Sequence, residues 1–226
     1  MPIFPSLYAI LDPSLLTISE MILAETLAES GVELIQYRNK NAPSRDLFEI
    51  SRRLSSGLAQ RGVRFIVNDR PDIALLSGAG GVHVGQDDLG VEEARAICGA
   101  GRWVGISTHT LEQVAAADRT SADYVAFGPI FPTTTKQNPD AVVGTELLRR
   151  ARQITKKPLV AIGGITLERA AEVYGAGADS LAVVRDLICA VNPGERAGKY
   201  LEVAASVRAR KDSPGSGSAN LLIGGF

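Results

Sequence analysis

The chain has little cysteine, few aromatic residues and no excess of charge of either sign. Its 226 residues include two cysteines and two histidines, aromatic residues make up 5%, and the net charge is −1. Two cysteines exclude a disulfide framework, and Cys98 and Cys189 lack the spacing of metal ligands. The balanced charge excludes a general attraction to nucleic acid or to a membrane surface, so any anion binding must be local.

No apolar run approaches the roughly 18 residues that a membrane-spanning helix needs. The first segment, MPIFPSLYAI, lacks the basic start and long apolar core of a signal peptide. We therefore expect a soluble, cytoplasmic protein with no nucleic-acid or membrane partner. Hydrophobic residues make up 45% and charged residues 22%, which is ordinary for a chain with a substantial core.

Short apolar runs alternate with amphipathic helical patterns along the whole chain. The apolar runs predict eight strands at Leu7–Leu11, Leu34–Tyr37, Phe65–Val67, Val82–Val84, Trp103–Ile106, Tyr124–Phe127, Leu159–Ile162 and Ser180–Val184. The helical patterns predict helices at Ile18–Ser30, Ser44–Arg61, Ile73–Leu76, Val91–Ile97, Leu111–Asp118, Thr145–Gln153, Leu167–Tyr174 and Pro193–Arg210.

Eight strand–helix units with short connections predict the α/β class and a single (β/α)8 TIM barrel, which we place at residues 1–211. The alternative is an open doubly wound sheet. That fold would carry a glycine-rich fingerprint after its first strand, where this chain has Asp12 and Pro13. The remaining residues, 212–226, are rich in Gly, Pro and Ser, and we expect a flexible tail or one docked on a neighbouring chain.

Glycine precedes many of the predicted strands. Gly31, Gly62, Gly80, Gly99 and Gly177 are in this position, where a positive φ closes a helix at little cost.

The stretch Asp123–Lys136, DYVAFGPIFPTTTK, runs from an apolar strand into a polar loop. Gly128 and Pro129 turn the backbone out of the sheet, and three threonines and a lysine follow. Hydroxyl groups and an ammonium group just past a strand suit phosphate oxygens. The alternative interpretation is an ordinary turn with solvated threonines.

Polar side chains follow the second strand. In a barrel of this kind, the residues just after each strand converge on one face. Alternation places Gln36, Arg38 and Lys40 on one side of the extended segment, whereas Tyr37 and Asn39 point away. Two cations and an amide on one side favour binding of a polyphosphate. The alternative is a solvated pair of charges at the rim.

Carboxylates follow the third and fourth strands. Asp69 and Asp88 could hold one Mg²⁺, which takes few protein ligands and completes its shell with water and phosphate oxygens. Alternatively, Asp69 caps the helix that begins near Pro71, and Asp87 competes with Asp88 for the metal.

The later strand ends add further candidates. Ser107 is interpreted as a phosphate or amide ligand, and His109 as a general base or a residue of the helix start. His83 lies within an apolar strand and is interpreted as an interior residue with satisfied hydrogen bonds. Gly163 and Gly164 leave backbone N–H groups open to a monophosphate.

An ordered set of motifs resembles the thiamine-phosphate synthase (thiamine-phosphate pyrophosphorylase) family: IQYRNK, VNDRPDIAL, GVHVGQDDL, GISTHT, DYVAFGPIFPTTTK, NPDAVVG and AIGGIT. It covers roughly residues 7 to 191. The resemblance implies a transferase of thiamine biosynthesis. It would condense 4-amino-2-methyl-5-(diphosphooxymethyl)pyrimidine with a 4-methyl-5-(2-phosphooxyethyl)thiazole, or a carboxylated form of it, to thiamine phosphate and pyrophosphate. The implied cofactor is Mg²⁺, the partners are these two small molecules, and a homodimer is left open.

The resemblance also assigns residues. The pyrimidine diphosphate would be held by Gln36, Arg38, Lys40, Asn68 and Lys136, with Tyr37 and Asn39 also among the substrate-binding residues, and the metal would be held by Asp69 and Asp88. Ser107 would lie near the pyrimidine, and Lys136, Arg38 and Ser107 would be catalytic. The thiazole phosphate would be received by Thr133, Thr134, Thr135, Gly164, Val184 and Arg185. Arg185 departs from the family, which often has a small residue there.

The implied mechanism is a dissociative substitution that needs no protein nucleophile. Mg²⁺ and the cations stabilise the departing pyrophosphate, and the thiazole nitrogen attacks the carbocation that remains. The alternatives are a thiazole tautomerase with His109 as acid and base, and a non-catalytic ligand-binding barrel.

Overall fold

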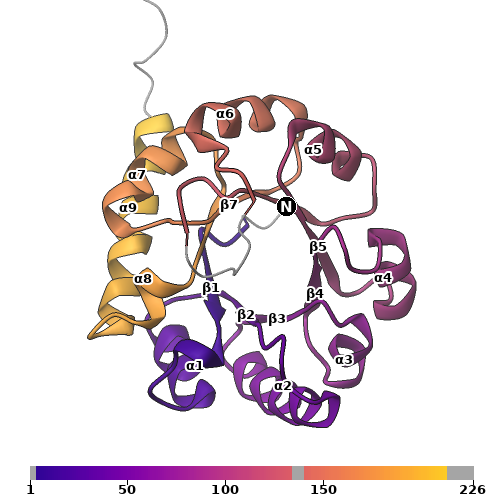
Figure 1. Ribbon diagram of the computed structural model, residues 1–226. Coiled ribbons are helices and arrows are strands. Elements are labelled where there is room, and N and C mark those ends of the chain that lie inside the picture. The colour runs from indigo at the N-terminus through magenta and orange to yellow at the C-terminus, as the bar shows by residue number, and fades with distance from the viewer. Residues whose placement is uncertain (1–3, 134–139, 213–226) are drawn as a thin grey trace, which may run out of the picture.

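Eight parallel strands form a closed barrel, in which each strand pairs with the next along the chain and the last pairs with the first (Figure 1). The computed structural model describes residues 4–133 and 140–212, with side chains as far as 210. The strands are β1 (Leu7–Leu11), β2 (Leu34–Tyr37), β3 (Arg64–Asn68), β4 (Gly81–Val84), β5 (Trp103–Thr108), β6 (Tyr124–Phe127), β7 (Leu159–Ile162) and β8 (Ser180–Val183).

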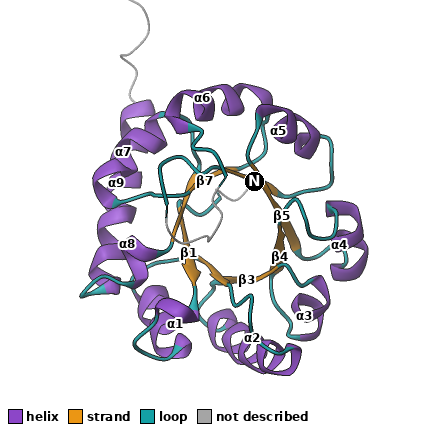
Figure 2. Cartoon of the chain, viewed as in Figure 1, coloured by secondary structure: helices purple, strands orange, loops and turns teal. Residues whose placement is uncertain are grey.

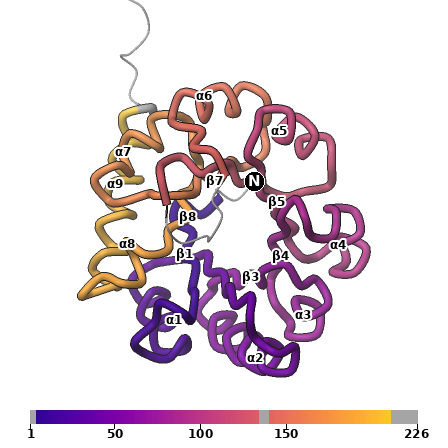
Figure 3. The backbone as a smooth tube through the Cα atoms, viewed as in Figure 1, coloured from indigo at the N-terminus to yellow at the C-terminus, as the bar shows by residue number. Residues whose placement is uncertain are grey.

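Helices form an outer ring around the strands (Figure 2). They are α1 (Glu20–Glu29), α2 (Ser44–Ala59), α3 (Pro71–Leu76), α4 (Val91–Cys98), α5 (Leu111–Asp118), α6 (Gly144–Ile154), α7 (Leu167–Gly175), α8 (Arg185–Ile188) and α9 (Pro193–Asp212), with a 3-10 turn, η1, at Pro13–Leu15. The chain passes once around the ring in sequence order (Figure 3). None of the helices in the described ranges is long and apolar enough to span a bilayer.

The predicted (β/α)8 barrel is confirmed, and all eight strands lie where the apolar runs placed them. Two short elements, η1 and α8, were not predicted. Each spans at most four residues, too few to show a helical period. The side chain of Asp12 starts η1 by accepting the N–H of Ser14 at 3.1 Å. Asp212 ends α9, and the rest of the expected tail lies outside the described residues.

One predicted helix terminator is wrong. Gly31, Gly62, Gly99 and Gly177 have positive φ, but Gly80 does not. The positive φ that ends α3 is found two residues earlier, at Gly78 (φ 72°). Because α3 is so short, its chain reverses at Gly78, where the N–H of Ala79 bonds back to the carbonyl oxygen of Ala74 at 3.0 Å.

The buried side chains form two layers, because successive residues of a strand point alternately into the barrel and out to the helices. The inner layer is the smaller one and consists of Tyr8, Ile10, Leu34, Ile66, Tyr124, Ala126, Val160 and Ala182. Phe4 stacks on Trp103, with ring centroids 5.1 Å apart, and packs beside this layer. Gly105 leaves room for Tyr124, since a Cβ at this position would lie 2.0 Å from the phenol ring.

Asp186 ties the last helices to the barrel. Its carboxylate accepts from Arg196 on α9, at 2.7 and 3.0 Å, from the hydroxyl of Tyr200 at 2.6 Å, and from the N–H of Leu167 on α7. Burial opposes ionisation of the carboxyl, but the bonds from Arg196 and Tyr200 hold the pKa of Asp186 below its ordinary value. α8 is thereby joined to α7 and α9, and both α8 and α9 contact β1.

Two aspartates fix the starts of neighbouring strands by the same device. Asp123, just before β6, accepts the N–H of Val104 (2.7 Å) and pairs with Arg95. Asp179, just before β8, accepts the N–H of Leu159 and pairs with Arg152, at 2.8 and 2.6 Å. Each carboxylate therefore accepts the N–H of a neighbouring strand at the amino-terminal end of the barrel. It also anchors an arginine from an outer helix.

Asp179→Ala should lower the free energy of unfolding by about 2 kcal/mol, because hydrogen bonds to a charged group are lost and Arg152 loses its carboxylate partner. The measurement is urea denaturation followed by circular dichroism. Glu202→Ala, which removes an exposed carboxylate from α9, is the matched control and should change stability little. Equal effects of the two substitutions on the free energy of unfolding would show that the contacts of Asp179 with Leu159 and Arg152 contribute nothing to stability.

Candidate active site

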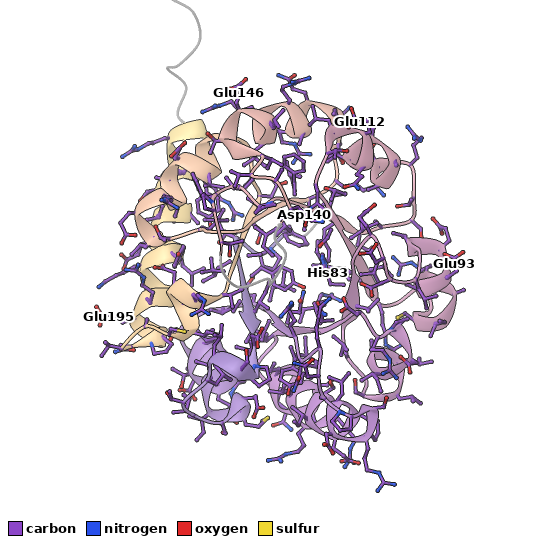
Figure 4. All side chains as sticks on the ribbon, viewed as in Figure 1. His83, Glu93, Glu112, Asp140, Glu146 and Glu195 are labelled. Atoms are coloured by element: carbon purple, nitrogen blue, oxygen red, sulfur yellow. The ribbon has the colours of Figure 1, made fainter. Side chains whose placement is uncertain are left out.

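The carboxyl ends of the strands surround a cavity of about 850 Å³, lined by residues from all eight strands or the loops that follow them. Its floor is the upper part of the inner layer, including Tyr8, Ala126, Val160 and Ala182. The two alanines leave this end of the barrel open, whereas large rings fill the opposite end. Figure 4 shows His83 and Asp140 within the ring of strands, while the labelled glutamates lie on the outer helices.

The segment after β2 supplies one wall of the cavity. Gln36, Arg38 and Lys40 line it, as the alternation predicted. Tyr37 is fully buried on the outer side of the strand, and Asn39 donates to its hydroxyl at 3.3 Å; neither residue lines the cavity. These two residues, predicted to bind substrate, therefore lie outside the cavity lining.

Acidic side chains hold both cations of this wall. Arg38 donates through Nη1 to Oδ2 of the nearly buried Asp12 at 2.7 Å, and Nζ of Lys40 lies 3.2 Å from Oδ2 of Asp69. Sequence reasoning missed Asp12 as part of this wall. Its position directly after β1, opposite the cations that follow β2, was the available signal.

Asp69 adopts a left-handed backbone conformation (φ 62°), the one described non-glycine residue to do so. Such a conformation costs of the order of 1 kcal/mol and is found where neighbouring structure enforces it. Here the N–H of Asp69 donates to the carbonyl oxygen of His83 on β4 at 2.8 Å. The predicted alternative, a cap on α3, is wrong, because Arg70 occupies the cap position.

Asp69 and Asp88 face one another across the mouth of β3 and β4. Burial is the main cause that raises the pKa of Asp69, and the nearby Asp88 carboxylate raises it further, against the opposing effect of Lys40. Oδ2 of Asp88 accepts the N–H of Gly85 at 2.7 Å, which fixes its direction. Asp87 also lines the cavity but is not part of this pair. Within the described ranges, no group of three or more Asp, Glu, His or Cys gathers as a metal cluster.

The opposite wall is built from the loops after β6, β7 and β8. Gly163 and Gly164 have φ of 96° and 63°, and a Cβ on Gly164 would lie 2.5 Å from the carbonyl oxygen of Pro132. Only glycine allows the two loops to pack this closely. Thr133, Val184 and Arg185 also line the cavity here. Thr134, Thr135 and Lys136 lie outside the described residues.

Arg169 is a cation of this wall that sequence reasoning missed. It donates to the carbonyl oxygen of Gly164 at 3.0 Å, and its guanidinium lies over the ring of Phe131, 4.4 Å from the centroid. A position in the first turn of α7 gave no sign that the side chain reaches back over the loop after β7.

His109 is held on both ring nitrogens. Nδ1 lies 2.6 Å from the carbonyl oxygen of Gly128, and Nε2 lies 3.5 Å from Oδ2 of Asp140. Its backbone N–H donates to the side chain of Gln113, one turn into α5. The residue lines the cavity from the start of α5, and its ring is anchored to the loop after β6.

A row of polar side chains crosses the cavity floor. Ser107 Oγ lies 2.9 Å from His83 Nε2, and His83 Nδ1 lies 3.0 Å from the hydroxyl of Tyr124. Tyr124 contacts the hydroxyl of Tyr8 at 2.9 Å, which accepts from Gln36 at 2.6 Å. Burial lowers the pKa of His83 to about 4, against the nearby charge of Asp88, so the imidazole is neutral.

The interpretation of His83 as an interior residue with satisfied hydrogen bonds is confirmed. That His83 also lines the cavity, and that Tyr8 and Tyr124 belong to the same row, was not predicted. A tyrosine inside a barrel must bring its hydroxyl to a partner, but an apolar run does not reveal which of its residues point inward.

A closed barrel with cations and paired carboxylates on one wall, and a glycine corner on the other, defines a (β/α)8 protein with a polar, charged cavity at the carboxyl ends of its strands. Residues 7–187 match the sequence model of the family described as thiamine monophosphate synthase. The chain belongs to this family, and the resemblance that its motifs indicated is confirmed.

Individual relatives agree. The chain is 47% identical over 209 residues to a thiamine-phosphate synthase of Koribacter versatilis, which covers 89% of this chain and 97% of that protein. It is 42% identical over 193 residues to one of Chloroflexus aurantiacus, with 85% and 88% covered. Among solved structures, thiamine phosphate pyrophosphorylase from Pyrococcus furiosus is similar, with a TM-score of 0.82, 33% identity, and coverage of 89% of this chain and 96% of that one.

Asp69→Asn should raise the melting temperature of the protein by a few degrees at neutral pH in the presence of a chelator. Asparagine accepts the left-handed conformation and removes a charge that burial and Asp88 disfavour. The folded wild-type carboxyl binds its proton more tightly than the unfolded one, so wild-type stability increases as the pH falls through the raised pKa. The difference between variant and wild type should therefore shrink at acid pH.

Differential scanning fluorimetry across a pH series measures this effect. Asp69→Ala is the matched control: it removes the same charge but tolerates the backbone conformation less well, so it should melt below Asp69→Asn. A melting temperature of Asp69→Asn below that of wild type at neutral pH would contradict the electrostatic conflict between the two carboxylates.

Proposed function

We propose that the chain is a thiamine-phosphate synthase, a transferase that joins the aminopyrimidine of a methylene diphosphate to the nitrogen of a thiazole phosphate. The observation that carries the proposal is the division of one cavity into a cationic wall with paired carboxylates and a separate glycine corner. A reaction with one diphosphate and one monophosphate substrate needs two such anion sites. Membership in the family supports the same activity.

The pyrimidine diphosphate lies against Gln36, Arg38, Lys40 and Asn68 in this proposal, with its diphosphate toward Arg38 and Lys40. Asp69 and Asp88 would hold Mg²⁺, which when bound would offset the negative charge of the diphosphate. The fit rests on their chemistry: the two carboxylates face one another at a cost, as the raised pKa of Asp69 indicates, and Mg²⁺ takes one or two carboxylates with water and phosphate oxygens.

The thiazole phosphate lies at the opposite wall. Gly164, Thr133 and the backbone of Val184 and Arg185 receive the phosphate, and Arg169 adds a cation held over Phe131. Thr134 and Thr135 complete this site in the proposal. Lys136, at the end of the same loop, would reach the diphosphate. The loop after β6 would then divide the two anion sites.

The residues of the cavity bind charge rather than attack carbon. The C–O bond to pyrophosphate breaks first, with the negative charge received by Arg38, Lys40 and Lys136. The electron-rich aminopyrimidine stabilises the methylene cation, and the thiazole nitrogen forms the new C–N bond. Ser107 lies at the cavity floor, where it would contact the pyrimidine. No protein nucleophile is required.

A thiazole tautomerase would use His109 as acid and base, but the two ring nitrogens of this residue face Gly128 and Asp140. Such an enzyme also has no use for Arg38 beside Asp12 or for the pair of Asp69 and Asp88. We further propose a cytoplasmic enzyme. A homodimer stays a prediction.

Incubation with the pyrimidine diphosphate, the thiazole phosphate and Mg²⁺ should release pyrophosphate, and Lys136→Ala and Asp69→Ala should each lower kcat/KM at least about 100-fold. A coupled pyrophosphate assay measures both. Lys199→Ala, which removes an exposed ammonium from α9, is the control and should retain wild-type rates. Near-normal turnover of both site variants would contradict the assignment.

Lys136 and Thr133, which both follow β6, should affect different kinetic constants when they are substituted. Lys136→Ala should lower kcat more than it raises KM for the thiazole phosphate, because the lysine acts on the leaving group. Thr133→Ala should show the opposite bias, with KM for the thiazole phosphate raised by about tenfold for one lost phosphate contact. Steady-state kinetics with each substrate varied in turn separates the two, and the same bias in both variants would contradict the division.

A further inference from the structure

Five side chains from five different strands form one unbroken hydrogen-bonded chain under the cavity, in the order Gln36, Tyr8, Tyr124, His83 and Ser107. The successive distances are 2.6, 2.9, 3.0 and 2.9 Å. Both ends of the chain, Gln36 and Ser107, line the cavity in which the substrates are proposed to react. Of the three middle residues, Tyr8 and His83 also line the cavity, and Tyr124 connects them beneath it.

The middle of the chain is shut off from solvent. Tyr8 is 1% exposed and Tyr124 is fully buried. The ring of Tyr124 stacks on His83 and meets Tyr8 edge to face, with centroids 5.5 and 5.9 Å apart. Gly105 leaves the space for this ring. Leaving a buried hydroxyl without a partner costs free energy comparable to that of a hydrogen bond. These groups must therefore bond to one another.

Counting protons fixes the direction of the bonds. Each tyrosine has one hydroxyl proton, and a neutral imidazole has one N–H donor and one acceptor nitrogen. Because Gln36 donates through Nε2 to Tyr8, Tyr8 donates to Tyr124, and Tyr124 donates to Nδ1 of His83. His83 then carries its proton on Nε2 and donates to Ser107. The reversed direction would require Gln36 to turn its amide oxygen toward Tyr8.

We propose that Tyr8, Tyr124 and His83 are positioning residues that set the hydrogen-bonding polarity of Gln36 and Ser107. The chain leaves the amide oxygen of Gln36 as an acceptor and the hydroxyl proton of Ser107 as a donor for a ligand. Because the bonds share one direction, the two ends are always complementary. Neither end can change its role without a change in every residue between them.

This polarity matches one substrate class and rests on the proposed function. An aminopyrimidine presents an N–H donor on its exocyclic amine beside an acceptor ring nitrogen, which are the complements of the Gln36 oxygen and the Ser107 hydroxyl. A thiazole phosphate has no such donor and acceptor pair. The chain should therefore affect recognition of the pyrimidine and leave recognition of the thiazole phosphate unchanged.

The kinetic test uses variants that remove one hydroxyl from the middle of the chain. Tyr124→Phe and Tyr8→Phe should each lower kcat/KM for the pyrimidine diphosphate about tenfold, with KM for the thiazole phosphate unchanged. The double variant should lose little more kcat/KM than either single variant. One missing hydroxyl already interrupts the chain, so Gln36 and Ser107 no longer have fixed donor and acceptor roles. Tyr174→Phe is the matched control: it removes a buried hydroxyl that donates to the Ser6 carbonyl oxygen at 2.8 Å, away from the cavity, and should leave both KM values unchanged.

Losses that are equal for both substrates, that match the control, or that add fully in the double variant would overturn the proposal. Wild-type pyrophosphate release, measured in the same assay, separates its failure from that of the proposed function: without wild-type release the synthase assignment fails, whereas wild-type release with an unaffected Tyr124→Phe overturns the positioning role alone.

A second measurement does not depend on activity. Nitrogen NMR of the wild-type chain, which has two histidines, reports the protonation of each ring nitrogen, and His109→Gln assigns the signals. His83 should carry its proton on Nε2, with Nδ1 unprotonated. A proton on Nδ1 of His83 would overturn the proposed direction of the chain.

Discussion

Closure of the parallel sheet is the constraint on which the other features of this protein depend. Eight strands hydrogen-bonded into a ring have no free edge, and their inner side chains must fill a space that solvent does not reach. At the amino-terminal end of the barrel, the rings of Phe4, Trp103 and Tyr124 fill this space. At the other end, Ala126 and Ala182 are too small to do so. The cavity is the part of the barrel interior that the side chains leave open.

The same closure determines the chemistry of the cavity floor. A tyrosine ring fills a barrel well, but its hydroxyl cannot be left unpaired there. Tyr8 and Tyr124 meet this requirement by bonding to each other and to groups at the cavity surface, Gln36 and His83. The same tyrosines therefore fill the interior and carry its hydrogen bonds. Through them, Gln36 and His83 are linked although they are not hydrogen-bonded to one another.

The cavity walls follow a different rule, in which favourable and unfavourable charge interactions are combined. Asp12 is paired with Arg38, which fixes the cation. Asp69 lies in a strained backbone conformation beside a second carboxylate, and its pKa is raised. Strain and repulsion of this kind persist only where the surrounding strands enforce them, here through the bond from Asp69 to the backbone of β4. The cation-binding role proposed for this pair would account for both.

The sequence predicted the features that depend on local pattern. Apolar runs located all eight strands, and the alternation from Gln36 to Lys40 separated the cavity side from the buried side. Features that depend on contacts between distant segments could not be predicted. The apolar run around Tyr124 is continuous, so its inward residues cannot be identified before the register is known. The reach of Arg169 back to Gly164 depends likewise on how the loop after β7 packs against the start of α7, and the position of Gly78 depends on where the short α3 ends.

The contrast between floor and walls has a functional consequence. Residues on the strands, such as Ser107 and His83, are held by the barrel ladder and by each other, whereas residues on the loops are held by side-chain pairs such as Arg38 with Asp12. Recognition of a ring by donor and acceptor groups needs fixed directions, which only the strands supply. Phosphates tolerate more variation in position, since any cation or N–H group at the right distance stabilises them. The proposed placement of the pyrimidine at the floor and of both phosphates at the walls agrees with this difference between strands and loops.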